Sequence, residues 1–193
     1  MRNLLWVVAI ASCGHAAAPE KSGPVPDTTK IRRGDKPLTL LGPTLDVGAA
    51  LPDFTVYDKE LKPVKLSALH KPIVISVVPS IDTKVCESQT HHVEAMAGEL
   101  PPGTEVYEVS RDLPFAQSRF TDEAQISHVK LLSDYRDRSF GTLMGLEVGE
   151  SGLLARSIWV IGSDGKIAYR QLVPDQGEEP ELDPVIAAIK AAK

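Results

Sequence analysis

One stretch constrains the fold of this sequence most. It has the pattern of a buried strand, followed at once by a turn and by the start of a helix that carries a cysteine. Residues 73–78 read I-V-I-S-V-V, a β-branched and nearly all apolar run typical of a central strand buried on both faces. Residues 79–86 read P-S-I-D-T-K-V-C, and apolar residues then recur at helical spacing over 84–100. We therefore expect Cys86 in the first turn of a helix. Backbone N–H groups and the helix dipole there favour the thiolate, which is the reactive form of cysteine.

The remaining sequence alternates between strand and helix signals, which predicts an α/β class. Strands are expected at 50–57, 104–110, 129–132, 153–162 and 166–173, and helices at 84–100, 114–120, 140–146 and 178–193. A hairpin is expected over 34–48, with its turn at 42–43. This order predicts one domain over 34–193, with a mixed central sheet flanked by helices and a preceding β-hairpin.

Composition narrows the functional classes. The chain has 193 residues, of which 42% are hydrophobic, and this fits one globular domain with an extra segment at one end. The net charge of −5 argues against a nucleic-acid partner, because phosphate binding needs clustered Lys and Arg. The only two cysteines, Cys13 and Cys86, exclude a disulfide framework and a cysteine-rich zinc or iron–sulfur site. No apolar run is long enough for an ordinary transmembrane helix.

The N-terminus has the pattern of an export signal. Arg2 precedes an apolar stretch at residues 4–11, and the stretch ends in I-A-S-C. This ending resembles a bacterial lipobox, so residues 1–12 are expected to be a lipoprotein-type signal peptide and Cys13 the lipidated residue. Residues 13–33, rich in proline and small residues, are expected to be a flexible tether. The protein would then be lipid-anchored at the bacterial cell envelope and face the periplasm.

Two other interpretations of this segment remain. Residues 16–18, A-A-A, could be the cleavage site of an ordinary secretory signal, which would give a soluble periplasmic or secreted protein. The segment could also be retained as a helix of a cytoplasmic protein.

Several motifs resemble those of one known family, and they occur along the chain in the same order as in that family. P-S-I-D-T-K-V-C resembles the P-x-x-x-T-x-x-C signature of peroxiredoxins, and D-L-P-F-A-Q-S-R-F at 112–120 resembles their thiol peroxidase branch. L-L-A-R at 153–156 and Q-L-V-P at 171–174 resemble that branch's arginine-bearing strand and C-terminal hairpin. The resemblance spans about residues 34–192. It implies a thioredoxin-like fold, a homodimer, and reduction of hydrogen peroxide and organic hydroperoxides without a metal or other cofactor.

The resemblance also implies a role for four residues. Cys86 matches the peroxidatic cysteine, whose thiolate attacks a peroxide oxygen and becomes a sulfenic acid. Thr83 lies one helical turn earlier and can point its hydroxyl at the same oxygens. Arg156 can stabilise the thiolate and the leaving oxygen by its permanent charge, and Pro79 can wall the pocket from water. Without the resemblance, each residue has a simpler interpretation. Cys86 could be an inert packing residue, Thr83 a helix N-cap, and Pro79 the residue that ends the strand.

The sequence departs from the family at one position. The thiol peroxidase branch usually carries a resolving cysteine after the motif at 112–120, where this chain has Thr121. We therefore expect an external thiol, a thioredoxin-like reductant or a second subunit's Cys86 to resolve the sulfenic acid. The alternative function is a peroxide-sensing or non-catalytic envelope lipoprotein. A thioredoxin-like disulfide reductase is excluded, because the sequence has no C-x-x-C motif.

Overall fold

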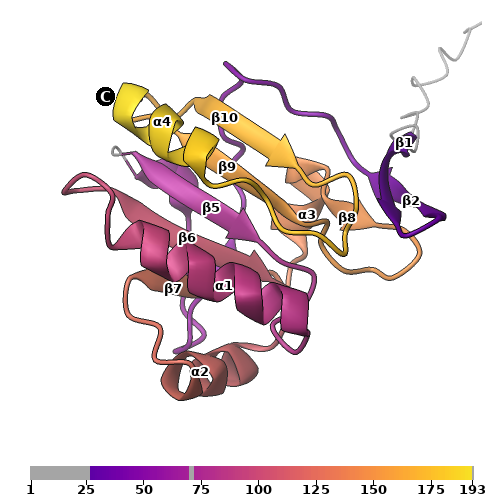
Figure 1. Ribbon diagram of the computed structural model, residues 1–193, viewed down its shortest axis with the longest axis horizontal. Coiled ribbons are helices and arrows are strands. Elements are labelled where there is room, and N and C mark those ends of the chain that lie inside the picture. Colours follow the sequence, from indigo (N-terminus) through magenta and orange to yellow (C-terminus); the bar gives the residue numbers. More distant parts are fainter. Residues whose placement is uncertain (1–26, 70–71, 193) are drawn as a thin grey trace, which may run out of the picture.

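A seven-stranded mixed sheet forms the centre of the computed structural model, which describes residues 27–69 and 72–192 (Figure 1). Its strands, in spatial order, are β10 (Ile167–Leu172), β9 (Ser157–Ile161), β5 (Ile73–Val77), β6 (Glu105–Ser110), β7 (Val129–Ser133), β3 (Val56–Tyr57) and β4 (Pro63–Val64). β5, β6 and β7 run parallel, while the other neighbours pair antiparallel. The predicted mixed sheet is thus confirmed.

Helices cover both faces of this sheet. On one face, α1 (Lys84–Ala97) and α4 (Asp183–Ala191) pack against alternate residues of β5 and β9, among them Val74 and Val160. On the other face, α3 (Ser139–Met144) packs against Ile75 and Trp159. α2 (Pro114–Glu123) lies beside β7, and a short 3-10 helix, η1, covers Leu66–Ala68 (Figure 1). All five residues of β5 are buried because neighbouring side chains enter opposite cores, which explains its continuous apolar sequence.

The N-terminal hairpin lies earlier in the sequence than predicted, by the length of one strand. β1 (Asp27–Arg33) pairs with β2 (Lys36–Leu41), and the turn lies at Gly34, whose positive φ of 59° suits glycine. β2 also pairs with β8 (Glu147–Val148), which the sequence did not predict. The predicted second hairpin strand after residue 43 is wrong, and so is the tether assignment for residues 27–33.

Long-range contacts explain why β1 escaped prediction. The backbone N–H of Arg32 donates to the carbonyl of Pro174 at 2.8 Å, and the carbonyl of Arg32 accepts from the N–H of Gln176 at 2.8 Å. Ile31, in a stretch of Lys and Arg, is 2% exposed. The strand therefore depends on a loop more than 140 residues away, and its local sequence carries little apolar pattern.

The other element boundaries differ most from the predictions at three places. The strand expected at 50–57 is reduced to β3, because Pro52 cannot donate a ladder hydrogen bond. Residues 153–155 precede β9 and bond the segment at 146–148, whereas the carbonyl of Arg156 accepts from the N–H of Val173, just after β10. The C-terminal helix begins only at Asp183, with a proline in its first turn.

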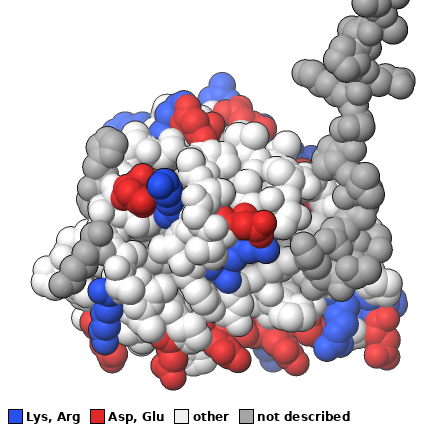
Figure 2. All heavy atoms as spheres, turned by 90° about the horizontal axis from the view of Figure 1, so that it is seen from above, with Lys and Arg blue, Asp and Glu red and all other residues white. Residues whose placement is uncertain are grey.

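The predicted signal peptide, the lipidated Cys13 and the tether over 13–26 lie outside the described residues. Within 27–69 and 72–192, no helix has the length and apolar character needed to cross a membrane. On the face shown in Figure 2, described Lys and Arg side chains lie next to Asp and Glu side chains and form no extended basic patch.

Candidate active site

Cys86 lies in the first turn of α1, directly after the turn that follows β5. Its side chain is fully buried and packs with Val78 and Ile81. The partly buried residues around this cluster come from α2 and β7 and are Ala116, Phe120 and Leu131. The thiol is therefore enclosed by apolar groups, and the polar contacts that reach it decide its chemistry.

Two side chains donate hydrogen bonds to the Cys86 sulfur. The hydroxyl of Thr83 lies 3.0 Å from Sγ, and Nη2 of Arg156 lies 3.2 Å from it. Thr83 occupies the N-cap position of α1, yet its side chain does not cap the helix and bonds the sulfur instead. The structure thus brings together Thr83, Cys86 and Arg156, although Cys86 and Arg156 are 70 residues apart in the sequence.

Arg156 is 2% exposed and reaches the sulfur from the segment just before β9. A buried guanidinium is costly unless its donors are satisfied. Nη1 donates to Oε1 of Gln89 at 2.6 Å, and Nε donates to the carbonyl of Gln176 at 3.3 Å. The backbone N–H of Arg156 also donates to Oε1 of Gln176, at 2.5 Å. Two glutamines therefore fix the position of this cation.

Pro79 lies in the turn between β5 and α1 and is half-buried. Asp112, after β6, holds this turn: its carboxylate accepts from the hydroxyl of Ser80 and from the N–H of Ile81, each at 2.8 Å. The turn that presents Thr83 and Cys86 is thereby fixed to the carboxyl end of β6.

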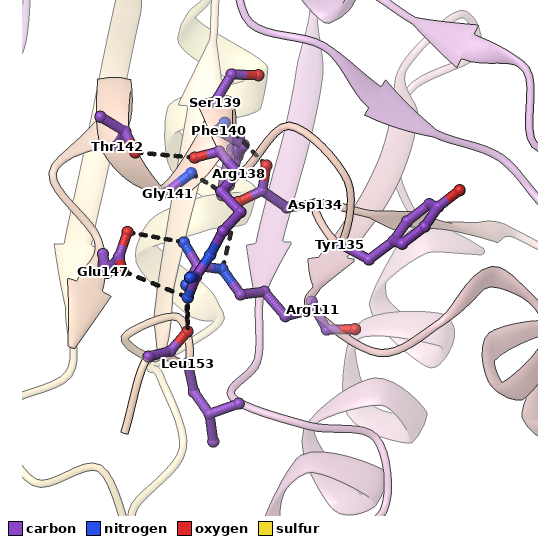
Figure 3. A network of polar contacts seen from close by, with 12 residues as sticks. Arg111, Asp134, Tyr135, Arg138, Ser139, Phe140, Gly141, Thr142, Glu147 and Leu153 are labelled. Atoms are coloured by element: carbon purple, nitrogen blue, oxygen red, sulfur yellow. Dashed lines mark hydrogen bonds and ion pairs between the residues drawn. The ribbon is translucent and has the colours of Figure 1, made fainter. Parts of the chain in front are cut away.

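A second polar network fixes the segment that leads to Arg156 (Figure 3). Arg111, next to Asp112, donates to the carbonyl of Gly152 and, through Nη2, to Glu147 at 3.0 Å. Its Nε lies 3.6 Å from the buried carboxylate of Asp134. Burial raises the pKa of Asp134, whereas the hydrogen bond from Arg111 lowers the pKa of Glu147. Arg111 and Asp112 thus anchor the two chain segments that meet at the sulfur.

Behind Cys86 lies a buried group of polar side chains on β5, β6 and α1. Nε2 of Gln89 donates to Oγ of Ser76 at 2.9 Å, and this hydroxyl lies 2.9 Å from Oε2 of Glu108. Oγ1 of Thr90 lies 2.7 Å from Oε1 of Glu108 and 2.9 Å from the carbonyl oxygen of Cys86. Burial raises the pKa of Glu108 to about 7, even though hydrogen bonding at its carboxyl group acts in the opposite direction.

The motifs did not reveal the supporting role of these residues, although Asp112 begins the motif at 112–120. Gln89, Gln176, Asp112 and Glu108 were not predicted as site residues. Glu108 had a recognisable sequence signal, because it is a charged residue between the apolar residues Tyr107 and Val109 of β6, and it stands opposite Ser76 in the parallel register.

Comparison with known proteins decides the family. Residues 46–186 match the Redoxin family. A thiol peroxidase of Halalkalibacterium halodurans is 44% identical over 157 residues, which cover 81% of this chain and 94% of the relative. A thiol peroxidase of Bacillus subtilis is 42% identical over 156 residues, covering 80% and 93%. The chain belongs to the thiol peroxidase family of peroxiredoxins.

Solved structures confirm the thioredoxin-like fold of this thiol peroxidase. The crystal structure of a peroxiredoxin-like protein from Aquifex aeolicus superposes with a TM-score of 0.81 at 37% identity, covering 87% of this chain and 99% of the other. A thiol peroxidase from Chromobacterium violaceum, at 20% identity, has the same fold with a TM-score of 0.75. The protein is therefore a peroxiredoxin-type enzyme, with a peroxide as substrate and a thiol as reductant.

The thiol peroxidase has one cysteine among its described residues, Cys86, and it is free. Thr121, at the position expected for a resolving cysteine, is half-buried on α2, and its hydroxyl donates to the carbonyl of Gln117 at 2.8 Å. Within the described part of the chain, no cluster of three or more His, Cys, Asp or Glu side chains could hold a metal ion.

Proposed function

We propose that this enzyme reduces peroxides with Cys86 as its peroxidatic cysteine and relies on an external thiol to complete the cycle. The observation that carries the proposal is the pair of donors on the sulfur, Thr83 at 3.0 Å and Arg156 at 3.2 Å. A thiol that merely fills a core needs no buried cation beside it, and a buried cation needs a compensating partner.

The reaction follows from these contacts. The Cys86 thiolate attacks one peroxide oxygen, and the O–O bond breaks with its electron pair moving to the other oxygen. That oxygen takes up a proton and leaves as water or alcohol, while Cys86 becomes a sulfenic acid. The guanidinium of Arg156 stabilises negative charge on the sulfur before attack and on the departing oxygen during it. Thr83 can turn its hydroxyl from the sulfur to the bound peroxide and so align the attack.

Access to the sulfur is expected from the side of Thr83. Cys86 is fully buried, whereas Thr83 is exposed and bonds the sulfur directly, so the Thr83 side chain lies between the sulfur and the solvent. The half-buried Pro79 stands in the same turn and lacks an N–H group, so it can limit water at the opening without competing for the peroxide.

Resolution requires a second thiol. An external thiolate attacks the sulfenic sulfur and water leaves, which gives a mixed disulfide on Cys86; a further thiol then releases the reduced enzyme. Thr121 supports this scheme, because its hydroxyl cannot take the place of a thiol. A low-molecular thiol, a thioredoxin-like protein and Cys86 of a second subunit are the candidate reductants, and the homodimer stays a prediction.

Steady-state peroxide consumption tests the proposal. The protein should consume hydrogen peroxide and an organic hydroperoxide when a small thiol is supplied, and Cys86→Ser should abolish consumption. Cys13→Ser serves as the control and should leave the rate unchanged. Equal consumption by the Cys86→Ser variant would refute the role of Cys86. Oxidation of Cys86 without turnover by any reductant would favour the peroxide-sensing alternative.

We also propose that Cys13 carries a lipid that anchors the enzyme at the bacterial cell envelope, facing the periplasm. The support is the sequence alone, in which an apolar stretch ends in I-A-S-C. Metabolic labelling with an alkyne-bearing fatty acid should mark the full chain but not its Cys13→Ser variant. A labelled variant, or an unlabelled protein whose mature N-terminus follows residues 16–18, would contradict the anchor.

A further inference from the structure

We propose that Glu108 is protonated in the working enzyme and closes a ring of hydrogen bonds that positions Arg156 against Cys86. The inference rests on the proposed roles of Cys86 and Arg156 and adds a positioning residue that lies outside the family motifs. Glu108 is on β6 and 1% exposed. Its two carboxyl oxygens meet the hydroxyls of Ser76 and Thr90, so it acts on the reacting atoms through other side chains.

The direction of the hydrogen bonds is fixed at Arg156, because a guanidinium can only donate. Oε1 of Gln89 must therefore face Nη1 of Arg156, 2.6 Å away. The amide nitrogen of Gln89 then points to Ser76 and donates to its Oγ at 2.9 Å. The single O–H of Ser76 is left to donate to Oε2 of Glu108, also at 2.9 Å. The chain of donors thus runs from Arg156 to the carboxyl group.

The other carboxyl oxygen faces a hydroxyl that has two acceptors but one proton. Oγ1 of Thr90 lies 2.9 Å from the carbonyl oxygen of Cys86 and 2.7 Å from Oε1 of Glu108. A carbonyl oxygen can only accept, so the Thr90 proton completes the contact with Cys86. The short contact between Thr90 and Glu108 then needs a proton on Glu108. A protonated carboxyl supplies one donor and one acceptor, which matches Thr90 and Ser76.

Burial and charge agree with this assignment. An ionised carboxylate inside the protein is costly without a directly bonded cation, and burial raises the pKa of Glu108 to about 7. The charge of Arg156 favours the carboxylate, and the charge of Asp112 opposes it. Ser76 on β5 and Thr90 on α1 are neutral. Since Arg156 already faces the Cys86 sulfur, a second buried anion would compete with the thiolate for the same cation.

Ionisation of Glu108 should change the activity of the enzyme. When Glu108 ionises, the ring loses its donor to Thr90, and a negative charge appears behind Arg156. Both changes weaken the hold of Arg156 on the thiolate. The rate of Cys86 oxidation by peroxide should therefore be lowered at alkaline pH, and this effect should disappear when residue 108 cannot ionise.

Glu108→Gln is the decisive variant, because a carboxamide also offers one donor and one acceptor. We expect its Cys86 oxidation rate to stay within about twofold of the wild type at about pH 6 and to exceed it by about threefold or more at about pH 8.5. Ser76→Ala interrupts the ring between Gln89 and Glu108 and should slow oxidation by about tenfold. Glu105→Gln, at the start of the same strand, is the matched control and should follow the wild type at every pH.

Infrared spectroscopy detects a protonated carboxyl group, which a purely structural role of Glu108 would not require. The wild type and Glu105→Gln should show, at about pH 6, a protonated-carboxyl band that Glu108→Gln lacks. The proposal is overturned if no band is lost in Glu108→Gln, if this variant is slower than the wild type by tenfold, or if Ser76→Ala has no effect. Should Cys86 be inert to peroxide in every variant, the proposed function would fail, while the infrared band would still decide the protonation of Glu108.

Discussion

Gln176 holds Arg156 through both its side chain and its backbone. Its Oε1 accepts from the N–H of Arg156 at 2.5 Å, and its carbonyl accepts from Nε of Arg156 at 3.3 Å. The N–H of Gln176 donates in turn to the carbonyl of Arg32 in β1. The N-terminal strand therefore supports the loop that positions the buried cation of the site, although β1 itself does not contact the sulfur.

Gln176→Ala should slow peroxide oxidation of Cys86 by about tenfold and lower the free energy of unfolding by about 1–3 kcal/mol, because it leaves a buried N–H without its acceptor. Single-turnover kinetics and chemical denaturation measure the two effects. Gln171→Ala, which removes a glutamine bonded to Tyr169 and Glu181, is the control and should leave the oxidation rate unchanged. A Gln176→Ala variant that reacts as fast as the wild type would refute this support of Arg156.

Thr83→Val should reduce the oxidation rate of Cys86 by about a hundredfold, because valine keeps the shape of threonine but cannot donate to the sulfur or to peroxide. Thr83→Ser keeps the hydroxyl and should remain within about fivefold of the wild type. Stopped-flow kinetics under single-turnover conditions compares the three proteins. Similar rates for the valine and serine variants would show that the hydroxyl contributes only to the local structure.

Arg111→Ala should lower the free energy of unfolding by about 3–5 kcal/mol, because it leaves the buried carboxylate of Asp134 without its cation. Arg138→Ala removes the other arginine that pairs with Glu147, but the Arg138 side chain is 49% exposed, so a loss of about 1 kcal/mol or less is expected. Urea denaturation of both variants gives the comparison. Equal losses would mean that burial does not distinguish the two ion pairs.

Glu108 should make the stability of the protein depend on pH. Its folded pKa of about 7 lies above its ordinary value of 4.5, so the folded state binds the proton more tightly than the unfolded state does. The stabilising contribution is therefore complete below about pH 4.5 and is lost as the pH rises to about 7. Relative to the wild type, Glu108→Gln should gain about 2–3 kcal/mol of stability between about pH 5 and pH 8. A difference that stays constant with pH would contradict the raised pKa.

Thr121→Cys should give the protein an intramolecular disulfide with Cys86 after peroxide treatment. α2 buries only Pro114 and Gln117, and the Oε1 atom of Gln117 is buried without a hydrogen-bond partner, so local unfolding of this helix should cost little. Non-reducing peptide mapping detects the disulfide. Ser118→Cys, on the same helix, is the control. Failure of Thr121→Cys to form the disulfide would show that α2 does not open during the reaction.

Local patterns predicted the centre of the fold, and the family resemblance predicted the side chains around the sulfur. β5 and α1 follow directly from their apolar spacing, and the motif residues Thr83, Cys86 and Arg156 meet as the family resemblance implied. β1 was missed because it depends on a loop that is distant in sequence, and its own residues carry little apolar pattern. Gln89 and Gln176 could not be recognised, because a glutamine carries no pattern of its own and its role depends on which cation the fold places beside it.

The central claim is that the domain begins the peroxide reaction with Cys86 and cannot finish it alone. Intact mass spectrometry after one equivalent of hydrogen peroxide, without added thiol, tests this claim most directly. We predict a chain heavier by one oxygen atom, with the addition located on Cys86 and removed by a small thiol through a mixed disulfide. An unchanged mass, or complete conversion to an intramolecular disulfide in the wild-type protein, would contradict the account.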